Sequence, residues 1–310
     1  MPEADHDLII IGGGPAGLTA ALYAARARLD VVVLERSLLG GQVLITDWID
    51  NYPGFPEGIT GPELSRHMAD QVARYDVPIL SEEVVQANLA GPVKTLHLPE
   101  RTLRARAVII ASGAAPKQLG VPGEADFFGK GISTCATCDG PFYKGKTVAA
   151  VGGGDTAVKE SVFLTKFAEK VYLIHRRDQF RAERILQEKA FSNDRIEVLW
   201  DTVVTGVSGL TRVETVHLRN LRTGESRMLP VAGLFIWIGI RPNTGFLGDQ
   251  IATDAFGFLK VDERMATDLP GVFAAGDVRV TPMRQIATAV GDAAIAAQSA
   301  ETYLEHPPES

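Results

Sequence analysis

One sequence pattern occurs twice in this chain, with the two copies 140 residues apart, and it limits the possible folds to a few. Each copy has a short aliphatic run, three consecutive glycines, a stretch with helical periodicity and a second aliphatic run. The first copy starts at residues 7–11 and the second at residues 147–151. A buried parallel strand that enters a glycine turn and a helix begins a dinucleotide-binding unit. The sequence therefore predicts an α/β fold with two Rossmann-like dinucleotide-binding domains, each with three layers around a mostly parallel sheet.

The glycines of the first copy have different expected roles. Gly12 permits a tight turn, Gly14 lets a pyrophosphate approach the backbone, and Gly17 lets the helix pack close to the sheet. The amino end of that helix then binds the anion. The candidate contacts to the two nucleotides are Gly12, Gly14, Pro15, Ala16 and Gly17 in the first copy, and Gly152, Gly154, Asp155 and Thr156 in the second.

The two copies differ where the second strand ends. Glu35 lies 23 residues after Gly12, and His175 lies 23 residues after Gly152. A carboxylate at this position accepts hydrogen bonds from ribose hydroxyls and repels a 2′-phosphate. His175 is followed by Arg176, Arg177 and Arg181, whose guanidinium groups suit such a phosphate. We therefore expect the second domain to bind NADPH, and the alternative interpretation of these arginines is a solvated helix entry.

The two copies also end alike, which indicates the domain boundaries. Residues 107–116 and 233–242 are each a hydrophobic run that ends in glycine and proline. The remaining segment is too short for a third nucleotide domain, yet it contains a strand before Gly276-Asp277 and an alanine-rich helix. We expect a discontinuous first domain made of residues 1–113 and 245–310, with the second domain at residues 114–244.

The chain has only two cysteines, Cys135 and Cys138. In a reducing compartment this CxxC spacing is typical of a redox dithiol or of half a zinc site. A closed zinc site needs four ligands, and no histidine lies within thirty residues of the pair. The spacing favours a redox pair without a metal, and a zinc site completed by distant histidines is the alternative.

Charge restricts the partners and the location. The net charge of −7 has the wrong sign for binding nucleic acid or an anionic membrane. The apolar run at residues 8–11 is too short for a secretory signal or a spanning helix. These features predict a cytoplasmic protein with no nucleic-acid or membrane partner.

These motifs jointly resemble the low-molecular-weight thioredoxin reductases of bacteria, which are pyridine nucleotide-disulfide oxidoreductases, over essentially the whole chain. Further motifs that carry the resemblance are residues 40–42, 135–140, 271–277 and 284–285. The resemblance implies a homodimer in which the first domain binds FAD, the second binds NADPH, and thioredoxin is the protein substrate. By the same resemblance, the residues expected at the FAD site are Gly40, Gly41, Gln42, Asn51, Gly276, Asp277, Arg284, Gln285 and Ile286.

The resemblance also implies the mechanism. Two electrons pass from NADPH to FAD, then to the Cys135–Cys138 disulfide, and then to oxidised thioredoxin. Cys138 is the sulfur expected to face the flavin, and Cys135 is expected to attack the partner disulfide. Asp139 is the candidate general acid, and a cap of the turn before Gly140 is its alternative role.

The reaction imposes a motion, because nicotinamide and disulfide belong to the same domain yet need the same flavin face. We therefore expect residues 114–244 to rotate relative to the rest of the chain. The competing functions are the same chemistry serving another redoxin or a peroxidase-linked carrier, a flavin oxidase, a redox sensor without turnover, and a ferredoxin-driven reductase.

Overall fold

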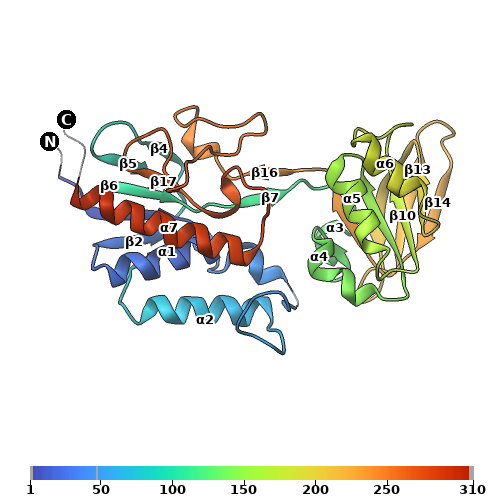
Figure 1. Cartoon of the computed structure of the whole chain (residues 1–310), viewed down its shortest axis with the longest axis horizontal. Helices are drawn as coiled ribbons and strands as arrows, with labels where there is room; N and C mark the ends of the chain where they lie inside the picture. Colours follow the sequence, from blue (N-terminus) through green and yellow to red (C-terminus); the bar gives the residue numbers. More distant parts are fainter. Residues whose placement is uncertain (1–2, 47, 307–310) are drawn as a thin grey trace. The chain divides into compact units, whose positions relative to one another are not determined.

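A computed structural model of the chain describes residues 3–46 and 48–306. The chain divides into two compact units (Figure 1). The first unit is discontinuous and combines the residues up to Ala115 with those from Arg241 onward, and the second is Pro116–Ile240.

The first unit is built on a sheet in which parallel strands lie at the centre. The strand order is β3-β2-β1-β6-β5-β4, and β17 also pairs with β6. The parallel strands are β1 (His6–Ile11), β2 (Val31–Leu34), β3 (Ile79–Leu80), β6 (Thr102–Ile110) and β17 (Val272–Ala274). Two antiparallel strands, β4 (Gln86–Asn88) and β5 (Lys94–His97), extend the sheet beyond β6. Strands β1 and β2 are uniformly aliphatic at their centres because both faces of the sheet are covered.

Three helices cover one face of this sheet: α1 (Pro15–Arg26), α2 (Gly61–Ala73) and α7 (Ile286–Glu305) (Figure 1). Helices α1 and α7 pack against each other through alanines. Ala20 and Ala24 of α1, and Ala296 and Ala300 of α7, are all at most 1% exposed. The small side chains let the two helices approach closely, which explains the alanine content of the helix predicted from Gln285 onward. The 3-10 turns of this unit are η1 (Gly41–Ile45), η3 (Gly245–Leu247) and η4 (Gly276–Val278).

The second unit repeats the arrangement with a parallel sheet of order β11-β10-β9-β15-β8. Its strands are β8 (Ile132–Ser133), β9 (Thr147–Gly152), β10 (Lys170–Ile174), β11 (Ile196–Leu199) and β15 (Leu234–Trp237). Strand β1 pairs with β2 as β9 pairs with β10, since Ile11 lies opposite Leu34 and Val151 lies opposite Ile174. The repeat in the sequence is therefore a repeat of strand register.

The outer layers of the second unit differ from each other. One core cluster joins the sheet to α5 (Asp155–Leu164) and α6 (Arg184–Phe191). The other joins it to an antiparallel meander of β12 (Thr202–Ser208), β13 (Thr215–Asn220) and β14 (Ser226–Pro230). The short helices are α3 (Glu124–Phe127), α4 (Ala136–Asp139) and η2 (Gly140–Tyr143). The α/β prediction is confirmed, and the structure adds that an antiparallel sheet forms one of the three layers.

The chain passes between the units in two short strands, β7 (Ala114–Pro116) and β16 (Ile240–Pro242), which pair with each other. Beside them, the Ser112 hydroxyl donates to the Asn243 carbonyl at 2.7 Å, and the Asn243 side-chain amide donates to the Ser112 carbonyl at 2.8 Å. Within residues 3–46 and 48–306, no helix combines the length and apolar composition needed to cross a membrane.

Candidate functional site

The first glycine turn has a backbone that other residues cannot adopt. Gly12 has a φ of +109°, and a Cβ atom there would lie 2.4 Å from the Ala111 carbonyl oxygen. A Cβ atom at Gly17 would lie 1.7 Å from the Gly12 carbonyl oxygen. Gly14 is the N-cap of α1, and the nearest atom to a Cβ there is the Gly41 Cα, at 4.0 Å. The amino end of α1 is thus open on the side of Gly41, and its N–H groups suit the pyrophosphate of a dinucleotide.

Glu35 is held against this turn. Its carboxylate accepts hydrogen bonds from the backbone N–H of Gly13 at 2.7 Å and of Ser37 at 2.8 Å. Each carboxylate oxygen has a second lone pair, so the side chain can also accept from a ribose hydroxyl. The two backbone bonds fix the orientation of the carboxylate before any ligand arrives.

Segments distant in sequence complete the region around the first turn. The Gly40 N–H donates to the Gly13 carbonyl at 2.8 Å, which brings the start of η1, with Gly41 and Gln42, beside the turn. A Cβ atom at Gly276 would lie 3.1 Å from the Cβ of Ala16, so η4 lies at the start of α1. The structure therefore brings the predicted FAD-site segments at residues 12–17, 40–42 and 276–277 together within one unit.

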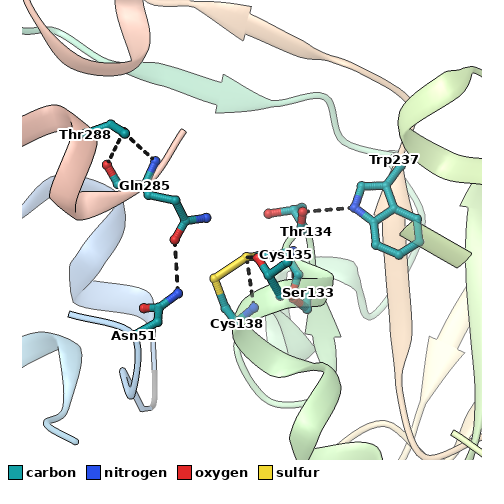
Figure 2. Close-up of a disulfide and its surroundings, with 9 residues drawn as sticks. Asn51, Ser133, Thr134, Cys135, Cys138, Trp237, Gln285 and Thr288 are labelled. Atoms are coloured by element: carbon teal, nitrogen blue, oxygen red, sulfur yellow. Dashed lines mark hydrogen bonds between the residues drawn. A yellow bond between two sulfur atoms is a disulfide. The ribbon is translucent and has the colours of Figure 1, made fainter. Parts of the chain in front are cut away.

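Asn51 joins the same region through Gln285. The Asn51 side-chain amide donates to the Gln285 side-chain carbonyl at 3.1 Å (Figure 2). Gln285 is also the N-cap of α7, where its backbone N–H donates to the Thr288 hydroxyl at 3.1 Å. Ile286 is the first residue of α7. A side-chain hydrogen bond thus joins the predicted contacts Asn51 and Gln285, and Ile286 follows Gln285 in the chain.

Asp277 and Arg284 are half-buried charged residues of the first unit. Burial raises the pKa of the Asp277 carboxyl above its ordinary value, whereas the Arg284 guanidinium lowers it. The Arg284 guanidinium lies over the Phe258 ring, 4.2 Å from the ring centroid. Arg284 Nε is buried and has no hydrogen-bond partner among the described residues. A buried donor of this kind fits a region where a polar ligand supplies the missing acceptor.

An ion pair that no sequence motif indicated supports Asp277. The Asp292 carboxylate in α7 accepts from Arg279 Nε at 2.7 Å and from Arg279 Nη2 at 2.5 Å. It also accepts from the Gly276 N–H at 3.2 Å. Asp292 therefore fixes the residues on both sides of Asp277. Its role could not be recognised from the sequence, because a pair 13 residues apart follows no helix or strand spacing.

The second glycine turn has the same open helix terminus. Gly154 is the N-cap of α5, and a Cβ atom there would have no described atom within 4 Å. Asp155 and Thr156 follow at the exposed start of the helix. The Asp155 carboxylate accepts from the Glu183 N–H at 2.8 Å, so it also supports the start of α6. A Cβ atom at Gly152 would lie 2.4 Å from the Trp237 carbonyl oxygen.

His175 and the arginines after it are placed differently from Glu35. A Cβ atom at Gly153 would lie 2.2 Å from the His175 ring, so the buried imidazole packs directly against the turn. Burial lowers the pKa of His175, which favours the neutral ring. Arg176, Arg177 and Arg181 are exposed, and the Arg181 N–H donates to the Gly153 carbonyl at 2.8 Å. The arginine segment is thus tied to the turn, with its charged groups in solvent.

Cys135 and Cys138 form a disulfide with a Cα–Cα distance of 5.3 Å (Figure 2). Cys135 is the N-cap of α4, and its Sγ accepts from the Cys138 N–H at 3.2 Å. Both cysteines are half-buried, as is Asp139, the last residue of α4. The disulfide is the oxidised form of the predicted dithiol. The part of the chain that the structure describes contains no cluster of three or more His, Cys, Asp or Glu side chains able to hold a metal ion.

Comparison with known proteins identifies the class to which this fold and site belong. Residues 6–293 match the family described as pyridine nucleotide-disulphide oxidoreductase, and the chain belongs to that family.

Within the family, the chain is similar to thioredoxin reductases. It is 48% identical over 300 residues to the thioredoxin reductase of Mycolicibacterium smegmatis, covering 96% of both chains. It is 45% identical over 307 residues to the bifunctional thioredoxin reductase/thioredoxin of Mycobacterium leprae (strain TN), covering 98% of this chain and 67% of that protein. The crystal structure of thioredoxin reductase from Streptococcus pyogenes MGAS5005 aligns with a TM-score of 0.92 at 44% identity, covering 97% of this chain and 98% of that chain.

Proposed function

We propose that this protein is an NADPH- and FAD-dependent reductase of the disulfide of thioredoxin. The observation that carries the proposal is the half-buried Cys135–Cys138 disulfide in a unit that also has its own dinucleotide turn. The identity of 48% to a thioredoxin reductase over nearly the whole chain supports it. The fusion partner in the name of the Mycobacterium leprae relative supports thioredoxin as the substrate.

The residues at the two glycine turns fit the two cofactors. The Gly14 end of α1 binds the pyrophosphate of FAD, and Glu35 accepts from its ribose. The Gly154 end of α5 binds the pyrophosphate of NADPH, and the exposed guanidinium groups of Arg176 and Arg177 bind its 2′-phosphate. When bound, the two cofactors together supply the two electrons that open the disulfide.

The chain's own groups then carry out thiol–disulfide exchange. Cys135, released as a thiolate, attacks one sulfur of the thioredoxin disulfide and forms a mixed disulfide while the other thioredoxin sulfur leaves. Cys138 attacks Cys135 Sγ, which releases reduced thioredoxin and restores the Cys135–Cys138 bond. Asp139 supplies a proton to the leaving thiolate. The two-residue spacing keeps Cys138 within reach of the mixed disulfide, so the intermediate is short-lived.

We infer that the protein is a homodimer in the cytoplasm. We also infer that its second unit moves during each catalytic cycle. The nicotinamide site and the disulfide are both carried by residues 114–244, whereas residues 1–113 and 245–310 hold FAD. One flavin face must serve both in turn, so the unit carrying them must rotate. The two paired strands β7 and β16 are where we expect the chain to bend.

An anaerobic titration tests the function. The purified yellow protein is titrated with NADPH, oxidised thioredoxin is then added, and the flavin absorbance is followed. We expect bleaching by NADPH and recovery of the oxidised spectrum on adding thioredoxin. A glutaredoxin-like carrier is tested in parallel, and Cys135→Ser and Cys138→Ser serve as controls that should bleach without recovering. Recovery of these variants on adding thioredoxin would overturn the role of the disulfide. Recovery of the unmodified protein only after oxygen is admitted would indicate an oxidase, and recovery only with the glutaredoxin-like carrier would indicate another redoxin partner.

A further inference from the structure

Trp237 ends strand β15 in the second unit and lies in its core. The residue is 9% exposed. Its ring stacks on Phe235, with a centroid distance of 5.4 Å and an interplanar angle of 26°. Phe235 in turn meets the edge of Tyr143 at 5.3 Å. Packing therefore explains why an aromatic ring is present, but it does not require a ring with an N–H group.

The indole N–H has a specific partner next to the disulfide. Trp237 Nε1 donates to the carbonyl oxygen of Thr134 at 3.0 Å (Figure 2). Thr134 joins Ser133, the last residue of β8, to Cys135, the N-cap of α4. Tryptophan has one polar donor and no acceptor, so this bond satisfies the only polar group of its side chain. The side chain of Trp237 thus holds the backbone one residue before the redox pair.

Other hydrogen bonds hold the same segment from its own residues. The Cys135 N–H donates to the Ser133 hydroxyl at 3.0 Å, and the Cys138 N–H donates to Cys135 Sγ at 3.2 Å. Ser133 pairs with Phe235 in the parallel sheet. These bonds fix Ser133 and Cys135, and the Trp237 bond fixes the peptide between them. Without it, the Thr134 peptide can turn its carbonyl toward solvent and move Cys135 relative to Cys138.

We propose that Trp237 is a positioning residue for the redox pair, acting through the Thr134 carbonyl. Closing the disulfide is an intramolecular reaction, so its equilibrium depends on how often Cys135 and Cys138 are within bonding distance. An ordered Thr134 peptide raises that fraction and favours the disulfide over the dithiol. The role of Trp237 rests on the proposed function in one respect only, which is that the Cys135–Cys138 pair is redox-active.

Equilibration with glutathione tests this role. Two glutathione molecules reduce the disulfide, so that two electrons and two protons pass to the cysteines and one glutathione disulfide forms. The FAD-loaded full chain is equilibrated in glutathione buffers without oxygen, and the free thiols are trapped by alkylation and counted by mass. In Trp237→Phe, which keeps an aromatic ring but loses the N–H, we expect the equilibrium to shift about fivefold toward the dithiol, the size typical of one hydrogen bond. This shift corresponds to a potential about 20 mV more positive.

Trp200→Phe is the matched control, because it makes the same replacement in the same unit. The Trp200 ring packs on Phe180, with a centroid distance of 4.4 Å, and on Phe191 of α6, at 6.2 Å. We expect this variant to equilibrate as the unmodified protein does. An unchanged equilibrium in Trp237→Phe, or an equal shift in Trp200→Phe, would overturn the proposal.

A second substitution addresses folding. If Trp237→Phe does not fold or retain FAD, benzothienylalanine at position 237 replaces the N–H by sulfur with almost the same ring shape, and the same fivefold shift is expected. An unchanged equilibrium in that protein would likewise refute the role. The glutathione measurement uses neither NADPH nor thioredoxin. A protein that shows the shift but does not reduce thioredoxin would contradict the proposed function and leave the role of Trp237 standing.

Discussion

Asp292 should be one of the most sensitive polar residues of the first unit. The side chains of Asp292 and Arg279 are only 10% and 15% exposed, and two hydrogen bonds join them. Replacing Asp292 by Ala leaves the Arg279 charge buried without its partner and removes the acceptor of the Gly276 N–H. Breaking one side of a buried ion pair costs about 3–5 kcal/mol. For a unit of this size, such a loss corresponds to a fall in Tm of about 6–20 °C.

The assay is equilibrium unfolding in urea, followed by far-ultraviolet circular dichroism and by flavin fluorescence. We expect Asp292→Ala to lower the free energy of unfolding and to weaken retention of FAD, because the residues around Asp277 are no longer fixed. The control is the double variant Arg279→Met with Asp292→Leu, which removes both charges and should recover most of the stability. A loss below about 1 kcal/mol in Asp292→Ala, the range of an exposed pair, would refute the reasoning.

Three further predictions concern the two cofactor sites and the dithiol. Replacing Arg176 and Arg177 by Ala should raise the KM for NADPH at least about tenfold while leaving that for NADH nearly unchanged, since only NADPH has the 2′-phosphate; equal effects in steady-state assays would remove the assignment. Asp139→Asn should slow thioredoxin reduction about 100-fold while NADPH still bleaches the flavin; unchanged turnover would leave Asp139 as a structural residue. Burial raises the pKa of Asp277, so the folded state binds this proton more tightly than the unfolded state does. The free energy of unfolding therefore falls as the pH rises from the ordinary pKa of an aspartate to the raised pKa of Asp277. Asp277→Asn should therefore stabilise the FAD-free protein near pH 7, with a difference that vanishes in acid; urea unfolding that shows the same difference at both pH values would contradict the raised pKa.

Sequence motifs predict the features of this protein that depend on residues close together in the chain. The turn at Gly12 needs a positive φ, and Gly17 needs the absence of a side chain, so glycine at these positions specifies strand, turn and helix locally. The aliphatic runs before and after each turn specify buried parallel strands. The disulfide joins residues three apart, so its formation also depends on local geometry. These are the parts of the fold and of the candidate site that the motifs predicted.

Contacts between segments whose separation follows no helical or strand period depend on how the layers assemble. The internal repeat places His175 at the position that corresponds to Glu35. Only the packing of the turn at Gly153 determines that the imidazole is buried while the arginines remain in solvent. The Arg279–Asp292 pair and the bond from Trp237 to Thr134 depend on which helices and strands become neighbours. Local periodicity identifies the face of an element that is buried. The partner that a buried polar group finds there is fixed only when the layers assemble, because an unpaired donor or charge inside the protein is costly.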